Sequence, residues 1–244
     1  KKAAEFMIHY RDVSTGLPLP SYDLWEEQYG VLPFTASVVY GGLISAGHFA
    51  KILGKEEDTK RFYSEAESLR KAIISLLWNE EDKYFFKLIG DKLEKNANLD
   101  ASNFYGPFRF GVLSPDDPRM KEAFKILAAR LNKGINIGGF ARYEGDKYSH
   151  IEGSSTGNPW FVTTLWLTQY KIAVANSITE LQETAKDIEW TAKFAWSGML
   201  SEQLNPYTGD PLSATPLTWS HAELVRTVIE YDKKIKSLNA PKTP

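Results

Sequence analysis

The sequence of 244 residues contains no cysteine, so it offers neither a disulfide nor a thiol nucleophile. It also lacks an excess of charge of one sign, because 29 lysines and arginines stand against 31 aspartates and glutamates, a net charge of −2. This balance excludes the strongly basic surface that nucleic-acid binding requires, so no nucleic-acid partner is expected. No apolar run is long enough to cross a bilayer, and no membrane partner is expected either.

The N-terminal residues KKAAEFMIHYRD lack the pattern of a secretory signal peptide, since their basic start soon becomes mixed in charge. This pattern and the absence of cysteine favour a cytoplasmic location. The same residues predict an amphipathic helix that starts in mid-sequence. We therefore expect the native N-terminus to lie outside this chain.

What the sequence does contain is helical periodicity, in which apolar residues recur every three or four positions. Two helix starts carry a clear signal, because Asp117 and Asn158 each precede a proline, as an N-cap precedes a proline at the first helical position. About seven helices are expected. Besides the one at the N-terminus, they cover roughly residues 33–53, 57–78, 118–131, 159–174, 178–195 and 218 to the tail.

Local patterns refine this prediction. The helix at 33–53 is rich in small side chains, which let a neighbouring helix approach closely and predict an inner, tightly packed helix. These small residues are Ala36, Ser37, Gly41, Gly42, Ala46, Gly47 and Ala50. Residues 84–89, YFFKLI, predict a short strand. Ser220 and Glu223 predict a capping box near the start of the last helix.

Long segments without helical pattern separate these helices, and segments of that length are usually functional. They hold most of the glycine, proline and aromatic residues, and they cover residues 12–33, 79–116, 132–158 and 196–217. Helical hairpins with long loops on one side predict an all-α fold, an α/α toroid whose loops build a cleft on one face.

Two of these loops carry candidate catalytic carboxylates. The segment PSYDLWEEQYG places Glu26 and Glu27 behind Trp25, and the segment SGMLSEQLNPYTGDPLS contains Glu202. If the helices form a ring, both loops reach the same face. Two carboxylates across a cleft, one protonated and one ionised, are sufficient to cleave a glycosidic bond, and aromatic walls can hold the sugar ring. A loop glutamate considered alone is far more often a solvated surface charge.

The order of several motifs resembles glycoside hydrolase family 15, the family of glucoamylases, glucodextranases and prokaryotic trehalases. The motifs are PSYDLWEE, FTASVVYGGLISAGHFA, GNPWFVTTLWLTQ, SGMLSEQ and TGDPLSATPLTWSHAELV, and the resemblance covers about residues 1–232. Each motif alone is weak, but their common order is specific. The resemblance implies an (α/α)6 barrel, two concentric rings of helices with the active site at the loop end.

The resemblance also implies an inverting hydrolase that releases glucose from the non-reducing ends of α-glucans. In that family's pattern Glu26 is the general acid, Glu27 holds the sugar on the leaving-group side, and Glu202 is the general base. The further substrate-binding residues that the resemblance implies are Trp25, Arg142, Tyr143 and Gln203. An α-glucan or α-glucoside oligosaccharide is the expected partner, and neither a metal nor an organic cofactor is expected.

The predicted helices are fewer than a complete family barrel holds. The chain thus resembles the C-terminal part of a single catalytic domain, residues 1–236, followed by a frayed tail at 237–244. An incomplete ring exposes the apolar faces of its inner helices, which costs roughly 25 cal/mol per Å². We therefore expect the chain to pair with a complementary N-terminal half of the barrel or to self-associate, and its activity to need that missing half.

Two alternatives stay open at this point. One is a trehalase of the same family, which the loops of this chain do not separate from a glucoamylase. The other is a non-catalytic helical toroid that serves as a binding or scaffold module. The presence of both candidate carboxylates and of Arg142 disfavours the second alternative, since an idle copy has no need to keep all three.

Overall fold

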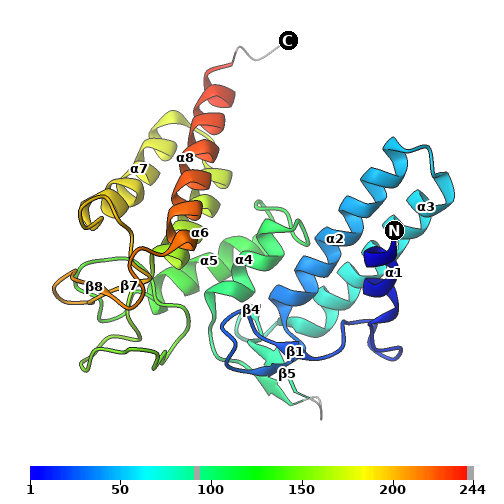
Figure 1. Cartoon of the computed structure of the whole chain (residues 1–244), viewed down its shortest axis with the longest axis horizontal. Coiled ribbons are helices and arrows are strands. Elements are labelled where there is room, and N and C mark those ends of the chain that lie inside the picture. The colour runs from blue at the N-terminus through cyan, green and yellow to red at the C-terminus, as the bar shows by residue number, and fades with distance from the viewer. Residues whose placement is uncertain (91–93, 241–244) are drawn as a thin grey trace. The chain divides into compact units, whose positions relative to one another are not determined.

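The computed structural model describes residues 1–90 and 94–240 and is predominantly helical (Figure 1). Within these residues the α-helices are Lys2–His9 (α1), Pro33–Ile52 (α2), Glu56–Ala72 (α3), Ala101–Arg109 (α4), Pro118–Arg130 (α5), Phe161–Val174 (α6), Ile178–Lys193 (α7) and Thr218–Asn239 (α8). A π-helical turn, Ile73–Leu77 (η1), continues α3. Helices therefore form at every position where the periodicity predicts one.

The strands are two residues long and form antiparallel ribbons. The pairs are Ser21–Tyr22 (β1) with Tyr29–Gly30 (β2), Trp78–Asn79 (β3) with Tyr84–Phe85 (β4), Leu88–Ile89 (β5) with Lys95–Asn96 (β6), and Gln203–Leu204 (β7) with Pro211–Leu212 (β8). The prediction of one strand over 84–89 is wrong. The N–H of Phe86 still bonds Leu77, whereas the N–H of Lys87 bonds Asn96, so the chain changes ribbons between these two residues.

The chain divides within α5 into two compact units, Lys1–Ala123 and Phe124–Pro244. Each unit has its own helices and its own buried residues. The prediction that residues 1–236 belong to a single catalytic domain stays a prediction.

In the first unit, α2 packs along α3 and against α4. A Cβ atom added to Gly47 would lie 2.6 Å from the Tyr63 ring, and one added to Gly41 would lie 2.9 Å from the Phe110 ring. Atoms do not approach so closely, so these glycines allow contacts that any larger residue would block. The small residues of α2 thus serve close packing, as predicted, whereas the inner position of this helix stays a prediction.

Helix α4 lies within a segment that was predicted to be a loop. Its interior contains Gly106 and Pro107, which are signals of turns rather than helices. Asp100 caps the helix by accepting a hydrogen bond from the N–H of Ser102, and residues 101–107 are all buried. Burial and the cap therefore outweigh the poor helix propensity of this segment.

In the second unit, α6 is buried along nearly its whole length and packs against α7 and α8. One apolar cluster at its start contains Phe161, Leu165, Leu200 and Leu204. A second cluster at its end contains Ile172, Ala175 and Leu181. A helix that is apolar on most sides occupies the interior of its unit.

Three helix termini test the predicted caps. Asp117 caps α5 as predicted, since its carboxylate accepts from the N–H of Arg119 at 2.9 Å. The predicted cap at Asn158 is wrong: α6 begins at Phe161, and the Asn158 amide instead donates to the Ser149 carbonyl. The Asn158 side chain therefore bonds residues outside α6 and does not cap that helix.

The capping box predicted for α8 is also wrong. Ser220 and Glu223 lie inside the helix, where the Ser220 hydroxyl donates to the Ser201 carbonyl and the Glu223 carboxylate accepts from Gln169. Both side chains are buried and bind other segments of the second unit. The helix runs to Asn239, into the predicted tail, and residues 241–244 lie outside the described residues. Among residues 1–90 and 94–240, no helix is both long and apolar enough to cross a membrane.

Candidate active site

The acid hairpin, residues 21–30, presents the first pair of candidate carboxylates. Strands β1 and β2 pair through Ser21 with Gly30 and Tyr22 with Tyr29. At the turn between them Glu26 adopts the left-handed backbone conformation, with a φ angle of 60°. Non-glycine residues rarely adopt this conformation, which concentrates at functional sites.

Asp23 holds this turn together. One oxygen of its buried carboxylate accepts from the backbone N–H groups of Glu27 at 2.8 Å and Gln28 at 3.2 Å. The other oxygen has no hydrogen-bond partner among the described residues. The sequence left the role of Asp23 unassigned, and the structure identifies it as the residue that fixes the backbone beside Glu26 and Glu27.

Trp25 anchors the other side of the hairpin. Its ring is only 8% exposed, and its indole N–H donates to the carboxylate of Asp100 at 3.0 Å. Asp100 in turn pairs with Lys87 at 3.3 Å, and both charged side chains are almost fully buried. The hairpin is therefore fastened to the interior of the first unit, whereas the Glu26 and Glu27 side chains are exposed. The predicted role of Trp25 as a sugar-binding wall stays a prediction.

Glu202 lies in the second unit, just before β7. Its carboxylate accepts a hydrogen bond from the hydroxyl of Ser213, and its N–H donates to the Ala214 carbonyl at 2.9 Å. Ser213 itself has a φ angle of 61°. Glu202 as a residue is partly buried, and Ser213 and Ala214 in the loop after β8 contact it.

Gln203, the next residue, is fully buried. Its side-chain oxygen accepts from the Asn158 amide at 2.7 Å, and its side-chain nitrogen has no partner among the described residues. This hydrogen bond holds the start of β7, directly after Glu202. A contact between Gln203 and substrate stays a prediction.

Arg142 is almost completely enclosed, with 3% exposure. Its Nε and Nη2 donate to the two oxygens of Asp146 at 2.7 Å and 2.8 Å. The guanidinium carbon also lies 5.2 Å, 5.2 Å and 4.6 Å from the ring centres of Tyr143, Tyr148 and Trp160. Cation–π contacts and a bidentate ion pair together define the orientation of this arginine. Asp146 is not among the residues predicted from the sequence, where its signal is a carboxylate four residues after the arginine.

The second unit brings two of its predicted site segments together. Trp160 forms β-bridges to Phe140 on one side and to Gln203 on the other. Arg142 follows Phe140 by two residues, and Glu202 immediately precedes Gln203. Trp160 therefore pairs with both the segment that carries Arg142 and the segment that carries Glu202, the general-base candidate.

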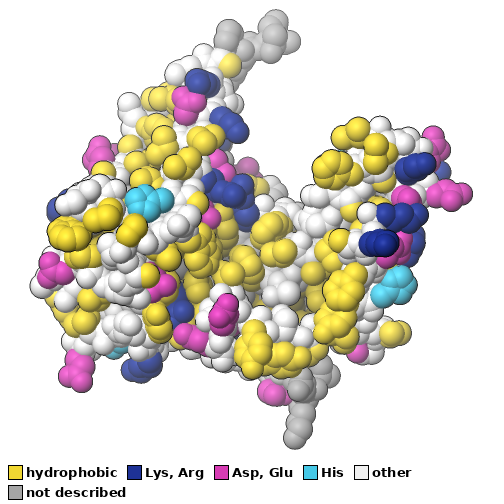
Figure 2. All heavy atoms as spheres, in the orientation of Figure 1, with side chains coloured by type: hydrophobic (Ala, Val, Ile, Leu, Met, Phe, Trp, Pro, Cys, Tyr) yellow, Lys and Arg dark blue, Asp and Glu magenta, His cyan; other side chains and the backbone are white. Residues whose placement is uncertain are grey.

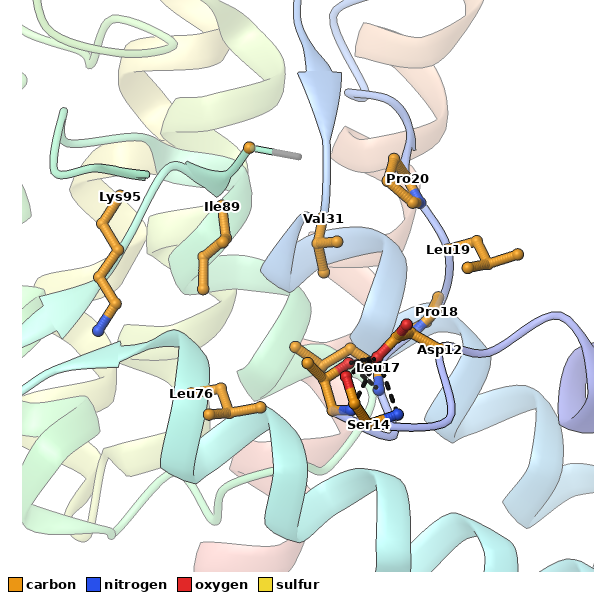
Figure 3. Close-up of a pocket in the computed structure, with 12 residues that line it drawn as sticks. Asp12, Ser14, Leu17, Pro18, Leu19, Pro20, Val31, Leu76, Ile89 and Lys95 are labelled. Atoms are coloured by element: carbon orange, nitrogen blue, oxygen red, sulfur yellow. Dashed lines mark hydrogen bonds between the residues drawn. The ribbon is translucent and has the colours of Figure 1, made fainter. Parts of the chain in front are cut away.

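A separate cavity of about 610 Å³ lies in the first unit, and Figure 3 shows the residues that line it. It is lined by Asp12, Ser14, Thr15, Leu17, Pro18, Leu19, Pro20, Val31, Leu76, Ile89, Gly90 and Lys95. The Asp12 carboxylate is occupied by hydrogen bonds from Ser14 and Thr15, and the one from the Ser14 hydroxyl in particular lowers the pKa of Asp12. This mainly apolar cavity contains none of the predicted site residues. Within the described ranges no group of three or more histidines and carboxylates is arranged to hold a metal ion.

Comparison with known proteins places these observations in a family. The model of glycosyl hydrolases family 15 matches residues 13–195 and 174–229. An uncharacterized glycosyl hydrolase of Methanocaldococcus jannaschii is 31% identical over 225 residues, which cover 88% of this chain and 35% of that protein. A glucoamylase of a Clostridium species is 25% identical over 236 residues, which cover 85% of this chain and 33% of that protein. The chain thus spans about a third of the length of these two relatives.

Solved structures show the same relationship in three dimensions. A bacterial glucoamylase in complex with acarbose matches with a TM-score of 0.73 at 24% identity. The matched region covers 97% of this chain and 39% of the glucoamylase chain. The glucoamylase of Saccharomycopsis fibuligera matches with a TM-score of 0.75 at 21% identity. The matched region covers 96% of this chain and 61% of that glucoamylase chain. At these identities the likeness shows the fold. The predicted (α/α)6 toroid fold of the glucoamylases is confirmed.

Proposed function

The chain belongs to glycosyl hydrolases family 15, and we propose that it supplies the acid and the base of an inverting α-glucoside hydrolase that removes glucose from non-reducing chain ends. The observation that carries the proposal is that Glu26 and Glu202 each occupy an anchored loop end. Asp23 ties down the backbone beside Glu26, and Ser213 holds the carboxylate of Glu202. The proposal concerns a protein that contains this chain, because the relatives are longer.

The proposed reaction needs only these two groups and one water molecule. Glu26, protonated, gives its proton to the glycosidic oxygen as the bond from that oxygen to the anomeric carbon breaks. Glu202, ionised, removes a proton from a water whose oxygen forms the new bond on the opposite face of the sugar. Room for that water requires the two carboxyl groups to lie about 6.5–9.5 Å apart.

Arg142 is proposed to donate hydrogen bonds to hydroxyl groups of the bound glucose. Its ion pair with Asp146 and its aromatic neighbours define the direction of the guanidinium before substrate arrives. A donor that is already oriented loses less conformational freedom on binding. Tyr143 belongs to the same cluster, and Glu27, exposed beside the acid, is proposed to contact the sugar on the leaving-group side.

An α-glucan is the proposed substrate. Curated relatives include glucoamylases, and one matching bacterial glucoamylase was solved in complex with acarbose. The chain carries the family motifs over residues 13–229. These relationships support glucose-releasing activity on starch-like chains.

The test is the release of glucose from maltoheptaose by the longer protein that contains this chain, as the wild type and as the variants Glu26→Gln and Glu202→Gln. Each variant keeps the size of its side chain but cannot exchange a proton, so turnover is expected to fall by roughly 10²–10⁴-fold. Glu57→Gln, at an exposed position in the first turn of α3, is the matched control and is expected to keep wild-type turnover. Undiminished turnover in either active-site variant contradicts the proposal.

A further inference from the structure

Asp100 accepts more hydrogen bonds than a helix cap requires. One of its oxygens accepts from the backbone N–H and the hydroxyl of Ser102, at 2.8 Å and 2.7 Å, and so completes the cap of α4. The other oxygen accepts from the indole N–H of Trp25 at 3.0 Å and lies 3.3 Å from the Nζ of Lys87. A cap needs a single acceptor, and serine or asparagine supplies it as well as aspartate does. The cap alone therefore does not account for the second oxygen.

The ion pair of Asp100 with Lys87 is removed from water, since the two side chains are 2% and 1% exposed. A buried ion pair adds little net stability compared with apolar residues of similar size. The backbone of Lys87 is itself held, because its N–H donates to the Asn96 carbonyl at 2.7 Å and its carbonyl accepts from the Asn103 amide of α4 at 2.8 Å. The pair thus fixes the position of the Asp100 carboxylate more than it stabilises the fold.

Trp25 links this carboxylate to the acid hairpin. Its ring is 8% exposed, so little of it is left to face a sugar, and its N–H is bound by Asp100. The next residue, Glu26, has the left-handed backbone conformation, and its N–H donates to the Asp23 carbonyl at 3.0 Å. The N–H of Glu27, on the other side, is held by the Asp23 carboxylate. The exposed side chain of Glu26 therefore starts from a backbone that is held on both sides.

We propose that Asp100 is a positioning residue for the general acid, and that it acts through the indole N–H of Trp25. This role rests on the proposed function, in which Glu26 gives its proton to the glycosidic oxygen. Proton transfer requires the carboxyl group to lie within about 2.6–3.2 Å of that oxygen. A misplacement of about 1 Å is sufficient to lower a rate by about 10²-fold. Loss of the bond between Asp100 and Trp25 releases one side of the turn and so impairs protonation of the leaving group.

The test compares two substrates with the longer protein that contains this chain. Maltoheptaose has a sugar leaving group that must be protonated, whereas α-glucosyl fluoride releases fluoride, which needs little help from an acid. Trp25→Phe keeps an aromatic ring and removes the N–H. It is expected to lower kcat on maltoheptaose by about 10- to 100-fold with KM changed by less than about threefold, and to lower kcat on α-glucosyl fluoride by less than about threefold. Glu26→Gln is the reference and is expected to show the same selectivity with a larger loss.

Trp78→Phe is the matched control, because it also removes an indole N–H that donates to a carboxylate, in this case that of Glu80 at 2.8 Å. It is expected to keep wild-type turnover on both substrates. Asp100→Asn is a second variant, in case Trp25→Phe does not fold. Its amide has one acceptor oxygen, which does not serve both Ser102 and Trp25, so the same selective loss is expected. Thermal melts give the folded fraction of each variant, and turnover is expressed per folded molecule.

The outcomes separate the positioning role from the proposed function. Equal losses on the two substrates in Trp25→Phe or Asp100→Asn indicate a general structural defect and overturn the positioning role. Wild-type turnover of maltoheptaose by either variant, or a raised KM with unchanged kcat, as loss of a sugar-binding wall would give, overturns it as well. A selective loss in Glu26→Gln alone contradicts only the positioning role. Undiminished turnover of maltoheptaose by Glu26→Gln contradicts the proposed function, and the positioning role with it.

Discussion

At the scale of single residues, Arg142 and Asp146 form an ion pair that is removed from water. Their side chains are 4% and 1% exposed, and the aromatic rings around the guanidinium exclude solvent further. Such a pair adds little net stability relative to apolar residues, but loss of one partner leaves a buried charge without compensation. The pair thus orients the Arg142 guanidinium, and the proposed contact with the sugar needs that orientation.

Asp146→Asn is therefore expected to lower the free energy of unfolding by about 3–5 kcal/mol, because Arg142 then remains buried and charged without its counterion. Denaturant unfolding at neutral pH measures the change. The matched control is Glu183→Gln, which breaks the solvent-exposed pair with Lys186 and is expected to change stability by less than about 1 kcal/mol. Similar losses in the two variants would contradict the role of burial.

Short motifs led to both candidate carboxylates and Arg142 as site residues, and their roles stay predictions. They did not identify Asp23 or Asp146 as partners. A hydrogen bond from Asp23 to the backbone of the turn depends on the turn geometry, and spacing alone does not specify which acidic residue faces an arginine. The residues that support the candidate site are therefore harder to find in the sequence than the candidates themselves.

At the scale of elements, the start of α5 depends on one carboxylate. Asp117 accepts from the N–H of Arg119 and pairs with its guanidinium at 2.7 Å. The side-chain hydrogen bond from Arg119 lowers the pKa of Asp117 below its ordinary value of 3.8. The ionised carboxylate is thus the form that stabilises the helix terminus.

Asp117→Ala is expected to lower the free energy of unfolding by about 0.5–2 kcal/mol at neutral pH. Because the folded-state pKa is lowered, this contribution is complete above about pH 4 and is lost as the pH falls through the folded-state pKa. The difference between variant and wild type should therefore shrink in acid, as thermal melts over a pH series will measure. Asp116→Ala, at an exposed neighbour paired with Lys121, is the control and should show little change at any pH. A difference that grows in acid would contradict the assignment.

Helix α4 shows a second element-scale effect, close contact through glycine. A Cβ atom at Gly106 would lie 2.9 Å from the backbone Cα of Phe34 in α2. Gly106→Ala is expected to destabilise the chain by about 1–3 kcal/mol through overpacking, although alanine favours helices by about 1 kcal/mol. Gly42→Ala is the matched control, since a Cβ there meets only the flexible side chain of Met7 at 3.0 Å. Equal or higher stability of Gly106→Ala in denaturant unfolding would show that the helices can separate without cost.

Periodicity predicted the long helices of both units, because burial of one face dictates the spacing of apolar residues. It failed for α4, where Gly106 and Pro107 indicate a loop and only tertiary packing makes the helix. It also failed for residues 84–89, where one apolar run serves two ribbons with different partners. Local sequence does not reveal which neighbour a short strand will find.

At the scale of the whole molecule, some large apolar side chains stay exposed to water. Phe49, Ile52 and Leu53, at the end of α2, are 68%, 80% and 69% exposed. Figure 2 shows hydrophobic side chains gathered at that end of the helix. Contiguous apolar patches of this kind mark contact surfaces. We propose that a complementary segment of the barrel, or in its absence a second copy of the chain, covers this patch.

Light scattering on the purified chain is expected to give a mass above the monomer mass of 27.6 kDa that rises with concentration. Phe49→Asp combined with Ile52→Asp should shift the mass toward the monomer, because a charge cannot be buried without a partner. Val13→Asp is the control, since Val13 is a fully exposed apolar residue in the segment after α1 and not in α2. A monomer at all concentrations for the unmodified chain would refute self-association through α2.

The joint action of Glu26 and Glu202 is tested most directly by proton NMR of the glucose first released from maltoheptaose. The wild type is expected to release the β-anomer, because a water activated by Glu202 attacks opposite the bond that Glu26 protonates. Glu26→Gln and Glu202→Gln are each expected to abolish that signal. Initial release of the α-anomer, or β-glucose formed at the wild-type rate by either variant, would contradict it.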